Sequence, residues 1–398
     1  MRILFIVPYV PSLIRVRSYN LIRTLASLGH AVHLVALQPP EDRYASVEGL
    51  CSFCEQVDVF PLSRLRTLWN AAAALPGALP LQAAYSHHPQ AMRHLRRLVD
   101  SGRFDVIHVE HLRGAVLAEG LNGAPRVFDS VDSISYLFDQ AARLAPKPTQ
   151  RLMARLDLGR TRRFEARAPF RYDCVLVTSP VDARAINELA GGRAQDRIAL
   201  LPNGVDLEYF RLTESPRDPA TILFSGKMSY HANAAAALHL GHEIMPRIWQ
   251  ERPDAALKVV GKDPPPAVRA MSANPRIVVT GFVDDVRPYF AQATLAVSPL
   301  LYGAGTQYKV LEAMACGVPV VVTPRVASGL RAQPGQDLLV EENPDDFASN
   351  ALRLLDDSEL RADIGRAGRR YVEKHHAWPE IVKNLIDIYS SCRAPARL

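Results

Sequence analysis

Residues 298–324 read SPLLYGAGTQYKVLEAMACGVPVVVTP, and this stretch decides the fold of the second half of the chain. An apolar strand reaches Pro299, a glycine-rich loop follows, and a short helix then leads through Gly317 into another apolar strand. Strands that are apolar on both faces and alternate with helices are typical of parallel sheets covered on both sides. The stretch therefore predicts a strand–helix–strand unit of an α/β domain.

The same alternation continues along the rest of the chain. The strand-like runs are 3–7, 31–37, 57–60, 104–109, 126–130, 174–179 and 197–201 in the first half, and 221–226, 256–261, 276–281, 294–299, 318–323 and 337–341 in the second. Two such series predict an α/β fold of two Rossmann-like domains facing a cleft. The stretch 211–220, rich in proline and charge, separates the two series and predicts a linker.

The composition fits two globular domains. The chain has 398 residues, of which 48% are hydrophobic and 22% charged, and these fractions exclude disordered and fibrous classes. Five cysteines in a chain of this length argue against a disulfide scaffold. The apolar run at the N-terminus is short and predicts a first strand, and no run of 18 apolar residues occurs. We therefore expect a soluble, cytoplasmic protein.

The positive charge is concentrated in the first half. Residues 1–205 contain 25 Lys and Arg against 18 Asp and Glu, whereas the remainder contains 22 against 23. Much of the excess lies in two helical stretches, 93–103 and 151–171. Such a surface suits anionic lipid head groups or an acidic substrate. The alternative is a solvated helix face in which Asp157 and Glu165 are interleaved. Nucleic acid is not expected as a partner, because the sequence contains no nucleic-acid-binding motif.

An apolar segment, RLRTLWNAAAALPGALPLQAAY (64–85), is interrupted by prolines and carries Trp69. It could dock on a membrane or on a lipid-linked acceptor, with Arg64 and Arg66 at its edge. The alternative is an excursion packed in the core of the first domain. Together with the basic first half, the segment suggests peripheral attachment to the inner face of the membrane.

Two charged residues begin the helix inside 298–324. Lys309 and Glu312 are three residues apart, so they share one face of that helix. They follow a loop that contains Gly303 and Gly305. Backbone N–H groups and the lysine could bind phosphates, while the glutamate accepts two ribose hydroxyls. The alternative is that the two side chains form a surface ion pair with each other.

A second candidate phosphate site follows strand 221–226. Gly226 allows the backbone to approach a ligand, and the helix after it offers unpaired N–H groups at its N-terminus. Lys227 would add a positive charge at the same place. A glycine before a helix is also common in ordinary turns, so this signal is weak by itself.

The run KVLEAMACGVPVVVTP (309–324) closely resembles the donor-site signature of the group 1, or family 4, retaining nucleotide-sugar glycosyltransferases. The resemblance covers most of the chain and is densest from 201 to 324. GAGTQYK (303–309) resembles the branch associated with bacterial exopolysaccharide and lipopolysaccharide assembly. Other segments that resemble the family, in the same order, are NLIRTLASLGHAVHLVAL (20–37), FDVIHVEH (104–111), LPNGVD (201–206), LFSGKMSYHAN (223–233) and VTGFVDDVRPYFAQATLAVSP (279–299).

The resemblance implies the GT-B arrangement and a transferase activity. Residues 1–205 would form the acceptor lobe and 206–375 the nucleotide-sugar lobe, with a C-terminal helix in 376–398 that packs back on the first lobe. The enzyme would move a hexosyl group from a nucleoside diphosphate sugar to a hydroxyl of a glycan or lipid-linked acceptor, with retention. No cofactor and no divalent metal are expected.

The resemblance also implies roles for individual residues. Glu312 would hold the ribose hydroxyls, and Lys227 and Lys309 would neutralise the leaving diphosphate as catalytic groups. The donor-binding residues implied by the matching motifs are Asn203, Gly226, Lys227, Gly305, Thr306, Gln307, Lys309 and Glu312.

The sequence departs from the family pattern in two places of the donor site. The usual first glutamate, eight residues before Glu312, is replaced by Ala304. The second cation of the phosphate loop is replaced by Ala232, and Lys309, Arg15 or Arg17 could supply the missing positive charge. In the first lobe the usual Gly-Gly loop is replaced by VPYVPSLIRVRSYN.

Strand 104–109 ends in histidines. The family places a histidine near the reacting sugar here, and His108, Glu110 and His111 all fall near that register. His111 is the favoured catalytic residue because it lies beyond the strand, whereas His108 is expected to be packed. A neutral imidazole could donate a hydrogen bond to a sugar hydroxyl and stabilise an oxocarbenium-like transition state.

Three other functions remain to be weighed. A GT-B relative that epimerises a nucleotide sugar would need no acceptor. A catalytically silent protein that binds nucleotide sugars would keep both lobes, and Ala304 permits this. A dinucleotide oxidoreductase is disfavoured, because no G-x-G-x-x-G follows the first strand.

Overall fold

The computed structural model describes residues 1–13, 15–40, 46–102, 104–145, 148–212, 217–303 and 305–393. The chain divides into two compact units. The first unit contains Met1–Asp139, Met153–Pro202 and Trp378–Leu398, and the second contains Gln140–Leu152 and Asn203–Ala377. The sequence alone placed this boundary at residue 205, and it gave residues 140–152 to the first domain.

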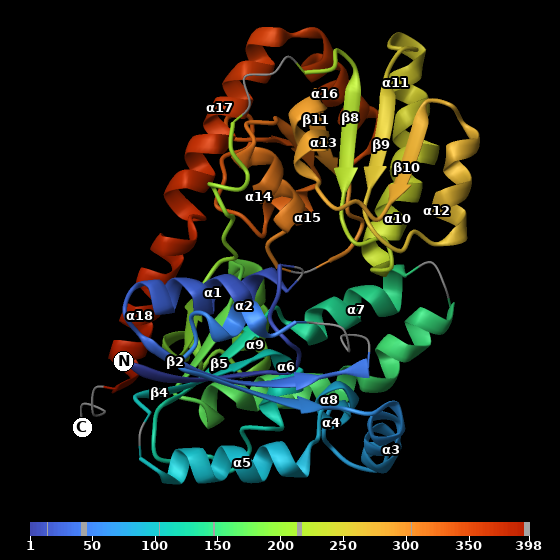
Figure 1. Cartoon of the computed structure of the whole chain (residues 1–398). Coiled ribbons are helices and arrows are strands. Elements are labelled where there is room, and N and C mark those ends of the chain that lie inside the picture. Colours follow the sequence, from blue (N-terminus) through green and yellow to red (C-terminus); the bar gives the residue numbers. More distant parts are fainter. Residues whose placement is uncertain are drawn as a thin grey trace. The chain divides into compact units, whose positions relative to one another are not determined.

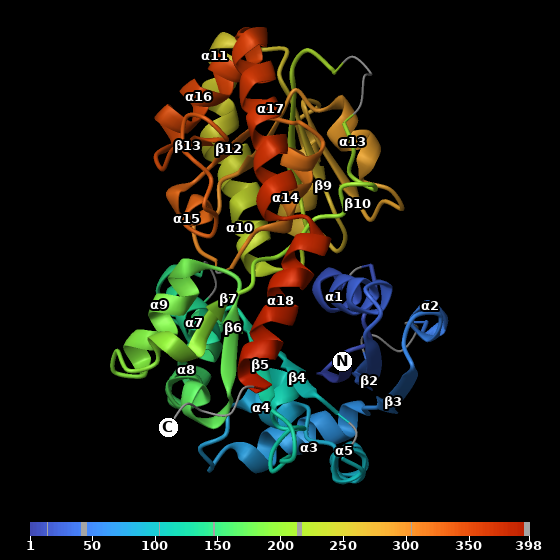
Figure 2. The same cartoon turned by 90° about the vertical axis from the view of Figure 1, so that its left-hand side faces the viewer.

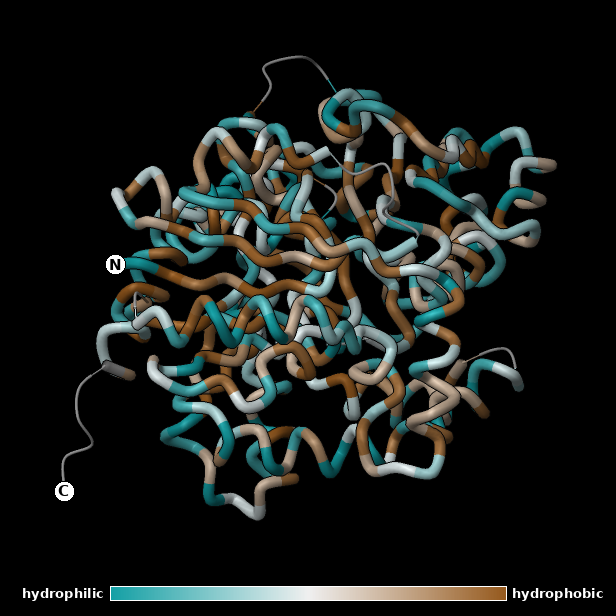
Figure 3. The backbone as a smooth tube through the Cα atoms, turned by 60° about the horizontal axis from the view of Figure 1, so that its bottom comes forward, coloured by the Kyte–Doolittle hydropathy of each residue, from teal (hydrophilic) through white to brown (hydrophobic). Residues whose placement is uncertain are grey.

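The first unit is built on a parallel sheet of seven strands in the order β3-β2-β1-β4-β5-β6-β7. Its strand β4 is buried along its whole length and β1 is buried at every residue except Arg2, because both faces are covered by helices (Figure 1). In Figure 3 the first strand, which starts beside the labelled N-terminus, is mostly brown. The strands are β1 (Arg2–Val7), β2 (Ala31–Gln38), β3 (Gln56–Pro61), β4 (Val106–Glu110), β5 (Arg126–Val131), β6 (Cys174–Val177) and β7 (Ile198–Leu200).

Helices of both halves of the sequence cover this sheet. The C-terminal helix α18 (Trp378–Arg393) packs against α1 (Val16–Ser27) (Figure 2). This confirms the prediction that the last helix packs on the first domain. The other helices of the first unit are α2 (Glu48–Cys51), α3 (Arg64–Ala74), α4 (Leu81–Tyr85), α5 (Pro89–Asp100), α6 (His111–Ala115), α8 (Pro148–Arg171), which begins in the second unit, and α9 (Pro180–Leu189).

The second unit is built on a parallel sheet of six strands in the order β10-β9-β8-β11-β12-β13. The strands are β8 (Thr221–Ser225), β9 (Ala256–Val260), β10 (Ile277–Gly281), β11 (Leu295–Ser298), β12 (Val320–Val322) and β13 (Leu339–Val340). The helices are α10 (His231–His239), α11 (Met245–Glu251), α12 (Pro266–Ala270), α13 (Arg287–Gln292), α14 (Tyr308–Ala315), α15 (Pro324–Ala327), α16 (Pro344–Asp356) and α17 (Ser358–His375); α7 (Ile134–Leu144) starts in the first unit and ends in the second.

The thirteen strand-like runs of the sequence coincide with these thirteen strands, and the α/β fold is confirmed. The stretch 211–220, which was predicted to be a linker, is bound to the second unit through Arg217. The guanidinium of Arg217 donates to the carbonyl oxygens of Phe290, Ala293 and Cys316, so it is anchored in the second unit. Residues 213–216 lie outside the described residues.

Candidate functional site

In each unit the strand order reverses between two neighbouring strands, β1 and β4 in the first and β8 and β11 in the second. Open parallel sheets bind ligands at the carboxyl ends of the strands at such a reversal. In the second unit these ends lead into Gly226–Lys227 and into the loop before α14. In the first unit β1 leads into the segment with Tyr9, and β4 ends at Glu110 and leads into His111. The candidate residues therefore follow the strands at the two reversals.

Gly226 and Gly261 form a close backbone contact at the ends of β8 and β9. A Cβ at Gly261 would lie 1.8 Å from the carbonyl oxygen of Gly226, so only glycine fits there. Gly226 has a φ of +145°, and a Cβ on it would lie 2.9 Å from Nδ2 of Asn233 and 3.1 Å from Cε of Lys309. Gly226 thus leaves room for the backbone between a buried amide and a lysine stem.

Lys309 and Glu312 lie on α14, both partly buried. Burial lowers the pKa of Lys309 to about 8, and the neighbouring Glu312 partly offsets this effect. Burial likewise raises the pKa of Glu312 to about 7, with the charge of Lys309 acting in the opposite direction. Among the described residues no ion pair joins the two side chains, and Nζ of Lys309 instead donates to Oε1 of Gln307 at 3.1 Å. The surface ion pair considered from the sequence is therefore wrong.

The loop after β8 holds Lys227 at the surface. Its side chain is exposed, and its carbonyl oxygen accepts a hydrogen bond from Nδ2 of Asn233 at 3.0 Å. Oδ1 of Asn233 is buried without a hydrogen-bond partner in the described chain. Asn233 is not among the candidates predicted from the sequence, and the signal for it is its place in the first turn of α10 directly after the glycine loop. Ala232, which replaces a family cation, is buried.

Side-chain hydrogen bonds hold the loop before α14 in place. Thr306 is buried and its hydroxyl donates to the carbonyl oxygen of Gly329 at 3.2 Å. Asn203 donates from Nδ2 to the carbonyl oxygen of Thr306 and accepts at Oδ1 from the Tyr308 hydroxyl. Gly305 has a φ of +69°, which suits glycine. The structure thus uses Asn203 and Thr306 to shape the loop.

Gln307 is the N-cap residue of α14, and it connects this loop to Lys309. Unpaired N–H groups of the first turn of a helix favour anions. The chain therefore brings Gly226, Lys309 and the start of α14 together. Ala304, the position of the missing glutamate, lies outside the described residues.

His111 is the first residue of α6 and has a φ of +66°. Histidine is one of the few residue types enriched in this left-handed region. Its Nδ1 accepts the backbone N–H of Arg113 at 3.2 Å, which leaves Nε2 as the protonated donor. Burial lowers the pKa of His111 to about 3, and Arg113 and Arg15 add to the shift. The imidazole is therefore a neutral donor at physiological pH.

His108 is fully buried, as the sequence predicted. Its ring stacks on Phe5 with centroids 4.1 Å apart, and its Nδ1 is 2.8 Å from the hydroxyl of Tyr389 on α18. Burial lowers the pKa of His108 to about 4, although Asp129 acts in the opposite direction. His108 therefore helps to pack the C-terminal helix onto the first sheet.

Glu110 belongs to a buried polar cluster that the sequence did not reveal. The hydroxyl of Tyr9 donates to Oε1 of Glu110, and Oε2 has no partner among the described residues. Burial raises the pKa of Glu110 to about 7, and the nearby Asp129 adds to the shift. Strands β1, β4 and β5 bring these residues together, which a single sequence does not reveal.

Arg17 belongs to this cluster. Its guanidinium lies 2.8 Å from Oδ2 of Asp129, and both side chains are almost fully buried. It also donates to the carbonyl oxygens of Leu201 and Pro202. The structure thus gives Arg17 a fixed place in the first unit, and the Arg15 guanidinium lies over the Tyr9 ring, 4.6 Å from its centroid.

Family models match both halves of the chain. Residues 14–209 match "Glycosyltransferase Family 4", and residues 219–357 match "Glycosyl transferases group 1". Both halves of the chain are therefore glycosyltransferase domains. Their fold is GT-B: the Anabaena protein HepE, solved in complex with UDP and glucose, is 16% identical with a TM-score of 0.65, over 98% of this chain and 100% of that one.

Two curated relatives of the glycosyltransferase domains are closer in sequence. A GDP-mannose-dependent monoacylated alpha-(1-6)-phosphatidylinositol monomannoside mannosyltransferase from Corynebacterium glutamicum is 28% identical over 48% of this chain and 55% of that protein. A D-inositol 3-phosphate glycosyltransferase from Nocardiopsis dassonvillei is 26% identical over 57% of each chain. The chain thus spans little more than half the length of the curated relatives it matches.

Among the described residues, no helix is both long and apolar enough to cross a membrane.

Proposed function

We propose that the protein is a retaining glycosyltransferase that moves a hexosyl group from a nucleoside diphosphate sugar to a hydroxyl of a glycan or lipid-linked acceptor. Exopolysaccharide or glycolipid assembly is the proposed setting. The named activities of the relatives, which include a mannosyltransferase and inositol phosphate glycosyltransferases, support a sugar transfer.

One observation carries the proposal. Lys309 and Glu312 are a desolvated cation and a desolvated carboxyl on one helix, and neither is neutralised by an ion pair in the described chain. Burying such groups costs free energy that a folded protein normally recovers through a partner. A nucleoside diphosphate supplies both partners, because its phosphates pair with the ammonium and its ribose hydroxyls donate to the carboxylate.

The proposed chemistry depends on stabilising the leaving diphosphate. Lys309, the exposed Lys227 and the N–H groups at the start of α14 would stabilise the charge that develops on it. In the first unit His111 would donate from Nε2 to a sugar hydroxyl, and its low pKa keeps it neutral in that role. We propose that this reaction needs no resident metal, because the lysines and helix N–H groups supply the positive charge.

We also propose that an anionic membrane surface binds the first unit. On α3 the side chains of Leu65, Leu68 and Trp69 are 82%, 68% and 71% exposed. On α8 the carboxylates of Asp157 and Glu165 are buried, so the expectation from the sequence that these two acids are interleaved on the solvated face of the helix is wrong. The outer face of α8 therefore presents exposed arginines, including Arg155, Arg163 and Arg167. Exposed apolar side chains beside basic ones suit anionic lipids.

The experiment that tests the activity uses a panel of nucleoside diphosphate sugars. Diphosphate release and thermal shift are measured together, with and without hydroxyl acceptors. Release that depends on an acceptor supports the transferase. Turnover without an acceptor indicates an epimerase or hydrolase, and stabilisation without turnover indicates a binding protein.

A substitution at Glu312 tests the site. Glu312→Ala is expected to abolish the thermal shift by UDP or GDP, because two ribose hydroxyls lose their acceptor. An unchanged shift would show that the nucleotide binds elsewhere.

A further inference from the structure

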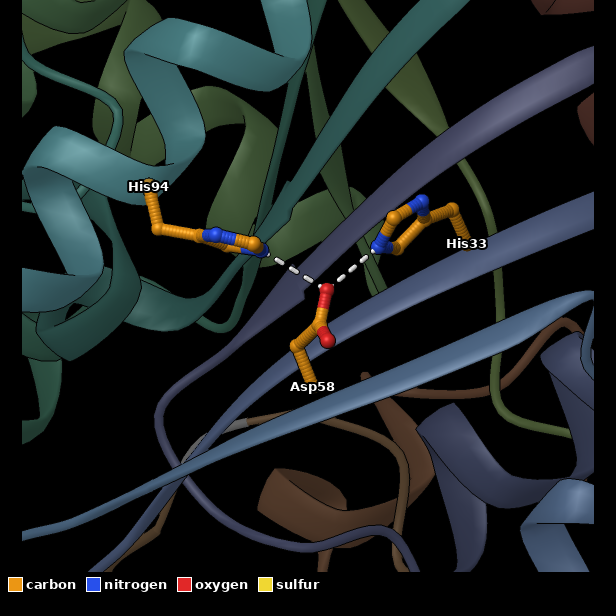
Figure 4. Close-up of side chains that lie close together, drawn as sticks. All are labelled: His33, Asp58 and His94. Atoms are coloured by element: carbon orange, nitrogen blue, oxygen red, sulfur yellow. Dashed lines mark hydrogen bonds and ion pairs between the residues drawn. The ribbon is translucent and has the colours of Figure 1, made fainter.

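A cluster in the first unit, away from the residues of the proposed reaction, converges on one carboxylate oxygen. Nε2 of His33 lies 2.6 Å and Nε2 of His94 lies 2.8 Å from Oδ2 of Asp58 (Figure 4). The side chains come from β2, α5 and the edge strand β3 respectively. The two histidine rings come from separate elements, and both therefore direct their Nε2 atom at Oδ2 of Asp58.

The register of the sheet explains this convergence. His33 pairs with Gln56, and Val35 pairs with Asp58, so the side chains of His33 and Asp58 lie diagonally on one face. Helix α5 covers that face with Ala91, Leu95 and Val99 in the core, and His94 lies next to this apolar stripe. Each of the three side chains is therefore held by a regular strand or helix.

Neighbouring side chains fix the orientation of the cluster. The ring of Phe60 lies 5.4 Å from the His94 ring, and Phe104 lies 5.8 Å from the His33 ring. The amide Nε2 of Gln56 donates to both carboxylate oxygens of Asp58 at 3.1 Å. The three ligand atoms lie within 4.8 Å of one another, and preoriented ligands of this kind are typical of metal sites.

We propose that His33, Asp58 and His94 bind a divalent transition metal of the zinc class, with water as a further ligand. Two imidazoles and one carboxylate are ligands that zinc accepts. The side chains of Asp58 and His94 are 22% and 32% exposed, which gives the ion and its water a path of entry. A metal-bound Nε2 carries no proton, so each ring would hold its remaining proton on Nδ1 when the ion is bound.

The distances to the carboxylate oxygen need only a small adjustment. Zinc bonds of roughly 2.0–2.1 Å place tetrahedral ligand atoms about 3.3 Å apart, so each nitrogen would move less than about 1 Å from the carboxylate oxygen, and rotation of the two rings would bring the nitrogens to the same spacing from each other. The ion would join the edge strand β3 to β2 and α5 and stabilise the folded first unit by binding it selectively. A second His, Glu and Asp group, at His108, Glu110 and Asp129, is a poorer candidate because the cation of Arg17 already pairs with Asp129.

The test uses the full chain without an affinity tag, freed of metal by chelation. Equilibrium dialysis against zinc is expected to give one bound ion per chain and a higher melting temperature. Cobalt is expected to give the absorption of a tetrahedral nitrogen–oxygen site. In His94→Gln, which can keep a hydrogen bond to Asp58, and in Asp58→Asn, zinc affinity should fall by more than the roughly 10- to 100-fold typical of losing a group that only orients a ligand.

The matched control is His242→Gln, which removes an exposed histidine of the second unit and should bind zinc as the parent does. Circular dichroism establishes that each variant is folded. No bound zinc in the parent, or equal binding in His94→Gln, Asp58→Asn and the parent, would overturn the proposal and leave the cluster as a hydrogen-bonded triad.

Discussion

Gly226 at the end of β8 and Lys309 on α14 are in contact, because a Cβ built on Gly226 would lie 3.1 Å from Cε of the lysine. The two residues are 83 positions apart in the sequence, and they meet because β8 and β11 are neighbours in the sheet. The contact brings the apolar stem of the lysine to the glycine loop, where the family's second cation is replaced by Ala232. We propose that the ammonium group of Lys309 supplies the positive charge of that missing cation.

Gly226→Ala should weaken nucleotide binding and stability together. The new methyl group would meet Asn233 at 2.9 Å and Lys309 at 3.1 Å, at a φ of +145° that L-residues rarely adopt. We expect a loss of roughly 1–3 kcal/mol in unfolding free energy and a weaker thermal shift by UDP or GDP. Gly335→Ala is the control: its φ is +80°, and nothing lies within 4 Å of its Cβ position. Equal effects of the two variants on nucleotide binding would argue against a phosphate loop at Gly226.

Glu312→Gln should stabilise the nucleotide-free protein at high pH while it weakens nucleotide binding. Burial raises the pKa of Glu312 from 4.5 to about 7, so the folded state holds the proton more tightly than the unfolded state. Ionisation of this carboxyl therefore lowers the free energy of unfolding as the pH rises from about 4.5 to 7. Above pH 7 the total loss is about 3 kcal/mol at most. Urea unfolding at pH 4 and pH 8 should show a gain for the variant only at pH 8. A gain of equal size at both pH values would contradict the ionisation of a buried carboxyl.

Lys309→Ala should reduce turnover more than it reduces binding. The ammonium would act on the charge that grows as the diphosphate leaves, so its removal affects kcat more than the affinity for the ground-state nucleotide sugar. Steady-state kinetics and calorimetry with the same donor measure the two effects. Lys374→Ala, which removes an exposed lysine from the last turn of α17, is the control and should change neither. Equal losses in turnover and affinity would assign Lys309 to binding alone.

The sequence predicted all thirteen strands, because the central parallel strands, buried on both faces, are continuous apolar runs and the edge strands are shorter β-rich runs between helical segments. It also predicted Lys309 and Glu312 as neighbours, because both lie on one helix turn. It did not predict the contact of Lys309 with Gly226 or the cluster of Tyr9 and Glu110. Those contacts depend on strand order, and local periodicity carries no information about which strands are neighbours.

Arg17 illustrates the same limit. From the sequence it was a candidate cation for the donor, yet the structure pairs it with Asp129, 112 positions away. Arg17→Met should therefore destabilise the protein by roughly 3–5 kcal/mol, since it leaves a buried carboxylate without its cation. Chemical unfolding measures the loss, and the affinity for UDP or GDP of the folded fraction should not change. Arg2→Ala is the control, because Arg2 and Glu55 form an exposed pair whose loss should cost about 1 kcal/mol or less. A large fall in nucleotide affinity in Arg17→Met would instead indicate that Arg17 binds the donor diphosphate.

Trp69→Glu should reduce binding to anionic membranes without loss of stability. The Trp69 side chain is 71% exposed on α3 and leaves the core intact when it is replaced. A carboxylate there removes an interfacial aromatic ring and adds repulsion from anionic head groups. Sedimentation with phosphatidylglycerol vesicles is expected to pellet the parent at low salt and much less of the variant, while phosphatidylcholine vesicles should pellet little of either. The control Arg370→Ala changes an exposed arginine of α17 in the second unit and lowers the net charge by one, as Trp69→Glu does. If that control loses as much vesicle binding as Trp69→Glu, the attraction depends on net charge and the apolar face of α3 has no part in it.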